Sequence, residues 1–334
     1  MKVQHNYSLK SHNTFGIDAK AKLFASFQNL EELREALSVD ETRLVLGGGS
    51  NILLTKDFDG LALKNELRGI EIREENDDEV LVKVGAGENR HEFVLYCIKQ
   101  GWPGLENLSL IPGSVGAAPM QNIGAYGIEL KDSFDSLEAV EISSGKVQEF
   151  GNKTCEFGYR SSIFKTRVKG QYIICSVNFR LKKKSALNTS YGAIESELER
   201  LGISDPGIAD VSQAVINIRQ SKLPDPKQIG NAGSFFKNPV LEKSFFEMLK
   251  KEFPNIPSYA NPDGRVKVPA GWLIEQAGWK GKRFGAYGVH QNQALVLVNY
   301  GGAQGADIFQ LSADILEDIR EKFSVRLERE VNIV

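Results

Sequence analysis

One segment of the chain combines the composition of a binding pocket with a single hydroxyl group. Residues 230–239 read Gly-Asn-Ala-Gly-Ser-Phe-Phe-Lys-Asn-Pro, so Ser234 lies between a glycine turn and two phenylalanines. Lys237 and Asn238 follow within reach of an anion. Binding pockets are mostly apolar walls with a few placed polar groups, and the segment therefore predicts one wall of a ligand site. The chain has no Gly-x-Ser-x-Gly sequence, which argues against a hydrolase nucleophile.

Two loops of small residues could hold a dinucleotide. One is the Gly-Gly-Gly-Ser-Asn sequence at 47–51, directly after an apolar segment, and the other is the Gly- and Pro-rich stretch 111–127. Glycine lets backbone amides approach an anion closely. Each loop alone is as consistent with a structural turn as with a ligand site, but two together could bind both ends of a pyrophosphate. Neither a Walker loop nor Gly-x-Gly-x-x-Gly is present, and a dinucleotide held without a Rossmann motif suggests a flavin.

Four other polar residues each leave two interpretations open. Arg160 is either a surface arginine or a clamp that binds a carboxylate through two parallel hydrogen bonds. Tyr191, in a polar loop, is a surface aromatic or part of a lid. Lys222, in the basic cluster 219–222, lies at a solvated helix end or binds phosphate. Glu330 lies on the polar side of an expected strand, and that side faces either solvent or a site.

Composition narrows the class of protein. The 41 basic and 43 acidic residues give a net charge of −2, so no global field attracts nucleic acid or a membrane. The three cysteines have no close pairing, which predicts buried thiols rather than a disulfide framework. The four histidines do not cluster, and we expect no metal site. The N-terminus lacks the apolar core of a signal peptide and no apolar run approaches membrane-spanning length, which predicts a cytoplasmic protein.

The elements that must position these residues can be read from hydrophobic periodicity. Helices are predicted at 29–38, 91–99, 208–219, 269–276 and 307–323, and strands at 43–46, 79–84, 137–150, 172–181 and 294–298. Helices and strands mix without a regular βαβ rhythm, which predicts an α+β fold. The length of 334 residues favours two or three domains, and the Ser-Lys-Leu-Pro-Asp-Pro sequence at 221–226 is the predicted boundary.

The motifs, in this order, resemble the UDP-N-acetylenolpyruvoylglucosamine reductase (MurB) family of bacterial peptidoglycan synthesis. The resemblance extends over essentially the whole chain and is carried by residues 46–51, 111–116, 121–127, 157–160, 221–224, 230–239 and 327–331. It implies an α+β fold with FAD-binding domains of the vanillyl-alcohol-oxidase (PCMH) type and a C-terminal α+β substrate-binding domain. The implied FAD-binding region is 1–217, with subdomains of about 1–67 and 68–217, onto which residues 325–334 pack back as a strand. The implied substrate-binding domain is 218–324.

The same resemblance implies a reaction in two halves. NADPH reduces FAD, and the reduced cofactor then gives a hydride to C3 of UDP-N-acetylglucosamine enolpyruvate while an acid protonates C2. Ser234 matches the proton donor, and Arg160 and Glu330 match the pair that stabilises the enolate. The residues that match substrate contacts are Tyr191, Lys222, Asn238 and Gln293, of which Tyr191 resembles the lid tyrosine of the first family subtype. The residues that match FAD-binding positions are Gly47, Gly48, Gly49, Ser50, Asn51, Pro112, Gly113, Gly116, Gln121, Gly124 and Tyr126.

Two positions depart from the family pattern, and two other functions compete with the reductase. Arg329 stands where proline is common, and Asn332 follows Val331. The first competing function is an oxidase of a small alcohol or sugar on the same flavin fold. The second is a nucleotide-sugar-binding regulator without chemistry. The presence of Ser234, Arg160 and Glu330 together argues against both.

Overall fold

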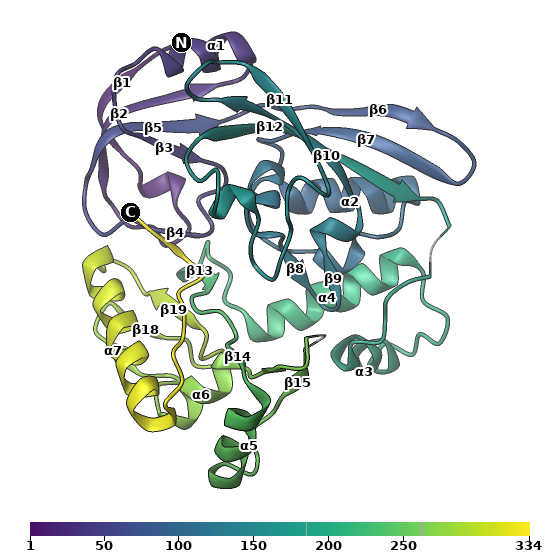
Figure 1. Ribbon diagram of the computed structural model, residues 1–334, viewed down its shortest axis with the longest axis vertical. Helices are drawn as coiled ribbons and strands as arrows, with labels where there is room; N and C mark the ends of the chain where they lie inside the picture. The colour runs from purple at the N-terminus through teal and green to yellow at the C-terminus, as the bar shows by residue number, and fades with distance from the viewer. Residues whose placement is uncertain (185, 262) are drawn as a thin grey trace. The chain divides into compact units, whose positions relative to one another are not determined.

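The computed structural model describes residues 1–184, 186–261 and 263–334, which form two compact units. Unit 1 consists of Met1–Tyr7, Ala21–Gly49 and Asp59–Ser221, and unit 2 of Ser8–Lys20, Ser50–Phe58 and Lys222–Val334. The chain passes between units several times (Figure 1), so a single boundary does not describe it. The last change of unit follows Ser221, one residue before helix α4 (Ile208–Lys222) ends.

Unit 1 contains a five-stranded antiparallel sheet. Its order is β11-β10-β12-β7-β6, with bounds β6 Ile70–Glu75, β7 Glu79–Gly85, β10 Phe134–Glu141, β11 Val147–Gly151 and β12 Tyr172–Lys182. In β7 every second residue is buried, as expected for a strand with one face toward a core. Helix α2 (Arg90–Gln100) packs its Phe93 ring on Phe179 of β12, with ring centroids 4.8 Å apart.

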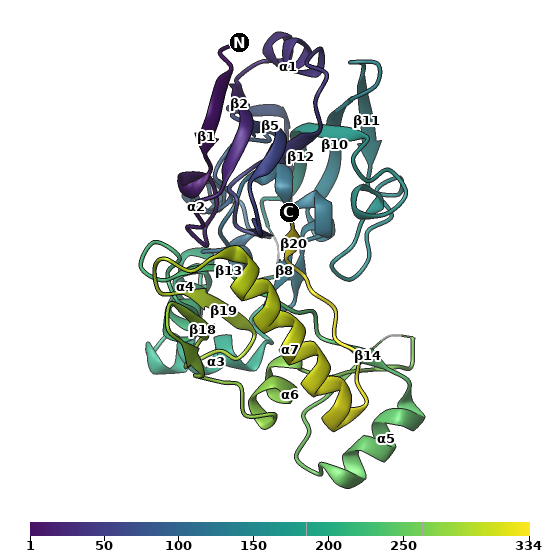
Figure 2. The same ribbon diagram turned by 90° about the vertical axis from the view of Figure 1, so that its left-hand side faces the viewer.

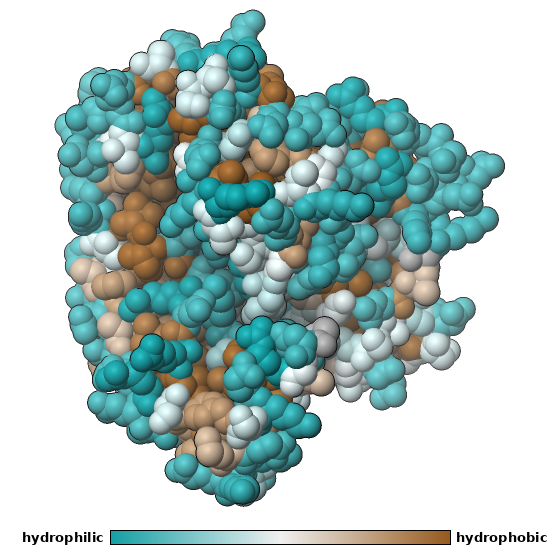
Figure 3. All heavy atoms as spheres, viewed as in Figure 1, coloured by the Kyte–Doolittle hydropathy of each residue, from teal (hydrophilic) through white to brown (hydrophobic). Residues whose placement is uncertain are grey.

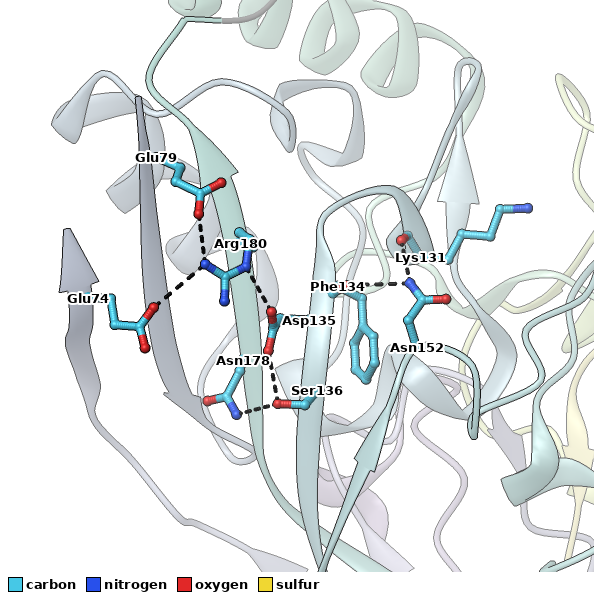
Figure 4. A network of polar contacts seen from close by, with 9 residues as sticks. All are labelled: Glu74, Glu79, Lys131, Phe134, Asp135, Ser136, Asn152, Asn178 and Arg180. Atoms are coloured by element: carbon cyan, nitrogen blue, oxygen red, sulfur yellow. Dashed lines mark hydrogen bonds and ion pairs between the residues drawn. The ribbon is translucent and has the colours of Figure 1, made fainter. Parts of the chain in front are cut away.

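Arg180 joins four strands of this sheet at its polar edge (Figure 4). Its Nε donates to Asp135 of β10 at 2.9 Å, and its Nη1 donates to Glu79 of β7 at 2.8 Å and lies 3.7 Å from Glu74 of β6. The hydrogen bond that Arg180 donates to Asp135 is the largest cause that raises the pKa of Arg180. Since the guanidinium is partly exposed, this network fixes strand register more than it adds stability.

A second sheet has the order β1-β2-β5-β3. Its strands are β1 Gln4–Ser8, β2 Lys20–Phe27, β3 Arg43–Leu46 and β5 Phe58–Asn65, and all but the end residues Ser8, Lys20 and Phe58 belong to unit 1. Helix α1 (Leu30–Leu37) buries Leu33 and Ala36. Helices α3 (Gly192–Arg200) and α4 (Ile208–Lys222) share a separate apolar cluster that includes Ile194, Leu198, Val211 and Val215.

Unit 2 is built around the sheet β13-β19-β18-β17. Its strands are β13 Gly230–Ser234, β17 Arg283–Phe284, β18 Tyr287–Val289 and β19 Val296–Asn299, beside a smaller sheet of β14 Val240–Leu241, β15 Tyr259–Ala260 and β16 Val266–Lys267. The helices are α5 Lys243–Glu252, α6 Ala270–Gln276 and α7 Gly305–Phe323. Helix α7 lies along β18 and β19 (Figure 2) and buries the apolar residues that its periodicity predicted.

The α+β prediction is confirmed, and most predicted elements are present within a few residues. The expected strand 137–150 is wrong in detail, because a turn that includes Gly145, at φ +68°, divides it into the hairpin β10–β11. Helices α3 and α5 were not predicted. The C-terminal segment contains only an isolated bridge at Arg329 and the short strand β20 (Asn332–Ile333), which pairs in parallel with β4 (Ile52–Leu53).

The hydrophilic surface, the helices and the cysteines can each be compared with what the sequence predicted. Hydrophilic residues cover most of the face drawn in Figure 3, with apolar residues in smaller groups between them. Among the described residues, no helix has both the length and the apolar character needed to span a bilayer. Cys97, Cys155 and Cys175 are all buried free thiols, as predicted, and burial raises the pKa of Cys155 and Cys175 to about 12.

Candidate active site

A β-bulge in unit 2 sets the position of Ser234. The register of β13 against β19 shifts between Asn231 and Ser234, and Gly233 between them has φ +70°. Asn231 Oδ1 accepts a 3.0 Å hydrogen bond from the Gly233 amide, which closes the local turn. A bulge re-aims the side chain that follows it. Ser234 is half-buried and is the last residue of β13, so the glycine-dependent turn before it sets the direction of its side chain.

The two phenylalanines after Ser234 are core residues rather than the wall of an open pocket. Phe235 is 0% exposed and Phe236 is 1% exposed, with ring centroids 5.3 Å apart. Phe235 also packs edge-on against Phe15, at 6.2 Å between centroids. Their burial holds in place the backbone of the segment that carries Ser234.

The C-terminal segment pairs with the serine segment and brings Glu330 beside it. The Glu330 amide donates to the Phe235 carbonyl oxygen at 2.8 Å, and the Lys237 amide donates to Glu328 at 2.9 Å. Val325, Leu327 and Val331 are buried and Ile333 is exposed, while Glu330 is half-buried. Two of the three predicted catalytic residues, Ser234 and Glu330, therefore lie on neighbouring backbones in unit 2.

The two departures from the family pattern both make specific contacts. Arg329 Nε donates to Ser312 Oγ of α7 at 2.7 Å, and its guanidinium lies 4.5 Å from the Phe309 ring centroid. Asn332 Nδ2 donates to the Asn51 carbonyl oxygen at 2.9 Å. Asn51 Nδ2 in turn lies 3.4 Å from the Glu330 carbonyl oxygen. Arg329 and Asn332 thus attach the segment that carries Glu330 to α7 and to residue 51.

Two predicted substrate residues meet at the start of α6. Asn238 Oδ1 accepts a 3.0 Å hydrogen bond from the Ala270 amide. Gln293 Oε1 accepts from the Leu295 amide at 3.3 Å, and it would lie 3.2 Å from a Cβ added to Gly271. Lys222 is exposed at the end of α4. The structure thus places both Asn238 and Gln293 at the start of α6. The side-chain oxygen of each already accepts a hydrogen bond from a backbone amide.

In unit 1 the two glycine loops pack directly on each other. A Cβ on Gly48 would lie 2.6 Å from the Gly113 Cα, and a Cβ on Gly47 would lie 2.2 Å from Ser114 Oγ. A Cβ on Gly116 would lie 2.4 Å from the Ala86 Cβ. These three glycines are therefore required by loop–loop contact, whereas the sequence had suggested close approach to a ligand. Ser50 and Asn51, the end of the first loop, belong to unit 2.

Four cationic side chains donate to carbonyl oxygens of these loops. Lys64 Nζ donates to Gly47, Arg90 Nη2 to Pro112, Arg160 Nη2 to Gly124 at 2.6 Å, and Arg219 Nε to Leu110 at 3.3 Å. Burial lowers the pKa of Lys64, Arg90 and Arg219. Positive charge is thus gathered under loops whose backbone could accept an anion.

Strained backbone accompanies the predicted site residues of unit 1. Arg160 has φ +51° and Tyr126 has φ +49°, and Leu110 and Asn122 also have positive φ. Such conformations are costly for residues with a Cβ and concentrate at functional sites. Tyr126 packs edge-on against the Tyr191 ring at 5.4 Å, which brings a predicted FAD residue and the predicted lid tyrosine together. Tyr191 is 43% exposed, which agrees with a surface aromatic as well as with a lid residue.

The sequence reading did not single out Lys64 or Arg90, and it considered Arg219 only as part of a basic cluster. Arg90 is the first residue of α2 and Lys64 lies near the end of β5, positions at which hydrophobic periodicity treats a charged residue as solvent-exposed. No signal in the sequence could have identified these residues, because their nearness to the glycine-rich loops is a property of the tertiary structure.

The residues of unit 1 fit a bound FAD. Arg90 Nε and Nη1 are buried without a hydrogen-bond partner, and the surrounding cations suit a diphosphate. Gly49 and Gly113, with their neighbours, would hold the diphosphate through backbone amides. Pro112 has no N–H, and the Gly116 amide already donates to the Ala86 carbonyl oxygen at 2.9 Å, so these two residues would shape the loop. Bound FAD supplies hydride transfer, which no side chain can perform.

Comparisons with known proteins agree with this assignment. A model described as an FAD binding domain matches residues 21–151, and the model of the UDP-N-acetylenolpyruvoylglucosamine reductase C-terminal domain matches residues 225–334. The solved UDP-N-acetylenolpyruvylglucosamine reductase (MurB) from Thermus caldophilus has the same fold, with a TM-score of 0.71 at 23% identity over 100% of this chain and 99% of that one. Fold and matched domain define an FAD-dependent oxidoreductase.

The relatives identify the family. The UDP-N-acetylenolpyruvoylglucosamine reductase of Flavobacterium johnsoniae is 55% identical over 100% of both chains, and that of Pseudomonas aeruginosa is 49% identical over 100% of this chain and 99% of its own. The chain belongs to the UDP-N-acetylenolpyruvoylglucosamine reductase family.

Proposed function

We propose that this protein reduces UDP-N-acetylglucosamine enolpyruvate to UDP-N-acetylmuramate through FAD, with NADPH as hydride donor, during cytoplasmic synthesis of peptidoglycan precursors. The observation that carries the proposal is the pairing of the Ser234 and Glu330 segments in unit 2. An enol ether reduction needs a proton at C2 as well as a hydride at C3. We assign the proton to the Ser234 hydroxyl, whose segment pairs with the segment that carries Glu330.

Ser234 is the proposed proton donor to C2. A serine hydroxyl is a weak acid in water, so it needs a strongly basic carbon to protonate. Negative charge that develops on the enolpyruvyl group provides that driving force, and a fixed hydroxyl avoids the cost of ordering at the moment of transfer. The buried rings of Phe235 and Phe236 hold the backbone that carries this hydroxyl.

Arg160 and Glu330 are proposed to act on the substrate carboxylate and the enolate derived from it. Arg160 Nη2 donates to the Gly124 carbonyl oxygen, and the planar fork of donors in a guanidinium suits a carboxylate. Tyr191, Lys222, Asn238 and Gln293 are proposed to bind the UDP part, with Lys222 as the phosphate cation. We further propose that residues 1–217 form the FAD-binding region and 218–324 the substrate-binding domain.

An anaerobic titration of the purified protein tests this function. We expect a yellow protein whose flavin absorbance is bleached by NADPH and restored by the enolpyruvyl substrate. Restoration by O₂ but not by the enolpyruvyl substrate would instead support an oxidase. A colourless protein that binds UDP-sugar without FAD would contradict the reductase outright.

A further inference from the structure

Arg90 is a buried cation whose acidic partner is missing from the described part of the chain. It is the first residue of α2 and only 7% exposed. Its Nη2 donates to the Pro112 carbonyl oxygen, while Nε and Nη1 are buried without a hydrogen-bond partner. Burial, together with the nearby Arg219 charge, lowers the pKa of the Arg90 guanidinium to about 9.

Its position on the helix adds to the cost. The N-terminus of an α-helix carries the positive end of the macrodipole, where a cation is disfavoured. A buried charge is usually retained only where an opposite charge compensates it. The helix dipole, burial and the Arg219 charge all disfavour the charged form of Arg90. Fold stability alone therefore gives no reason for a charged residue at this position.

The contacts of Arg90 point to one loop. Its backbone amide donates to the Gly113 carbonyl oxygen at 3.0 Å, in addition to the side-chain bond to Pro112. Leu110, which begins this loop with φ +58°, donates its amide to His91 Nδ1 at 2.9 Å and accepts from Arg219. The loop 110–113 is therefore hydrogen-bonded to α2 and to the guanidinium groups of Arg90 and Arg219.

We propose that Arg90 is a positioning residue for the cofactor, whose buried charge and bond to Pro112 prepare the loop 110–113 to receive the anionic diphosphate of FAD. This inference rests on the proposed function, which assigns that loop to FAD. In a low-dielectric interior the charge acts strongly across a single layer of backbone. The anion that compensates Arg90 is then supplied by the cofactor rather than by the chain.

Two substitutions separate charge from hydrogen bonding. Arg90→Gln keeps an N–H donor and loses the charge, whereas Arg90→Lys keeps both. Arg43→Gln is the matched control, because Arg43 also donates to loop carbonyl oxygens, of Leu37 and Val39, and also has a buried Nε without a partner. FAD is removed from each full-length protein, and its dissociation constant is measured by flavin fluorescence, alongside the unfolding temperature with and without FAD.

We expect Arg90→Gln to weaken FAD binding by about 10- to 100-fold, the range for loss of a charge-assisted interaction. Arg90→Lys and Arg43→Gln should stay within about 3-fold of the wild type. The unfolding temperature of FAD-free Arg90→Gln should equal or exceed that of the wild type, because the uncompensated charge is gone.

Equal FAD affinity in Arg90→Gln and the wild type would overturn the proposal. An equal loss of unfolding temperature with and without FAD would also overturn it, since that result indicates a structural role only. A wild-type protein that binds no FAD would instead refute the proposed function on which the inference rests.

Discussion

The amide of Glu330 donates a 2.8 Å hydrogen bond to the carbonyl oxygen of Phe235, the residue that follows Ser234. This bond joins the C-terminal segment to the serine segment, and the bulge at Gly233 sets the direction of the hydroxyl from the other side. The two proposed catalytic residues of unit 2 are therefore placed by backbone pairing rather than by their own side-chain contacts. Substitution of either side chain should leave the position of the other largely unchanged.

Arg329 should stabilise the segment that carries Glu330. Arg329→Met removes the hydrogen bond to Ser312 and the contact with the Phe309 ring, and we expect a loss of about 1–3 kcal/mol in the free energy of unfolding. Urea denaturation measures this loss. The control is Arg326→Met, which changes an exposed arginine in the same segment and should stay within about 0.5 kcal/mol of the wild type. Equal effects of the two variants would show that the Arg329 contacts add no stability.

Gly48 should be intolerant of a side chain because two loops meet there. A Cβ would lie 2.6 Å from the Gly113 Cα, which is backbone and cannot rotate away. We expect Gly48→Ala to lower stability by about 1–3 kcal/mol, as overpacking does, and to reduce the FAD content of the purified protein. In the control Gly151→Ala the added Cβ has nothing within 4 Å. Full FAD content in Gly48→Ala would argue against the contact between the loops.

The three thiols should be inert in the folded protein. Burial raises the pKa of Cys155 and Cys175 to about 12 and also raises the pKa of Cys97, so almost no thiolate is present at pH 8. We expect reaction with a disulfide reagent to be at least about 100-fold slower than for free cysteine, and all three thiols to react after denaturation. Rapid reaction of one equivalent in the native state would contradict the burial of that thiol.

The sequence predicted those parts of the fold that depend on local periodicity. Helix α7 and strand β7 were found because their apolar residues recur at helical and strand spacing over several turns or alternations. The hairpin β10–β11 was missed as two strands because apolar residues continue on both sides of its turn. Residues 8–20 and 50–58 could not be assigned to unit 2, since this depends on contacts with residues far along the chain.

The site was partly predictable for a related reason. The roles proposed for Ser234 and Glu330 come from motifs, but the pairing of their segments depends on a bulge and on residues almost one hundred positions later in the chain. The packing of Gly47 and Gly48 on a second loop was not predicted, because close approach to a loop and close approach to a ligand both require glycine. Arg90 gave no signal at all, since burial of a cation is a property of the tertiary structure.

The half-reactions of Ser234→Ala test the central claim most directly. Stopped-flow absorbance should show reduction by NADPH at the wild-type rate, because no proton from Ser234 enters that step. Reoxidation by the enolpyruvyl substrate should slow by about 10²- to 10⁴-fold, the range for loss of a positioned general acid. The exposed Ser258→Ala, also in unit 2, should leave both rates unchanged. Wild-type rates for both half-reactions in Ser234→Ala would contradict the assignment of Ser234 as the proton donor.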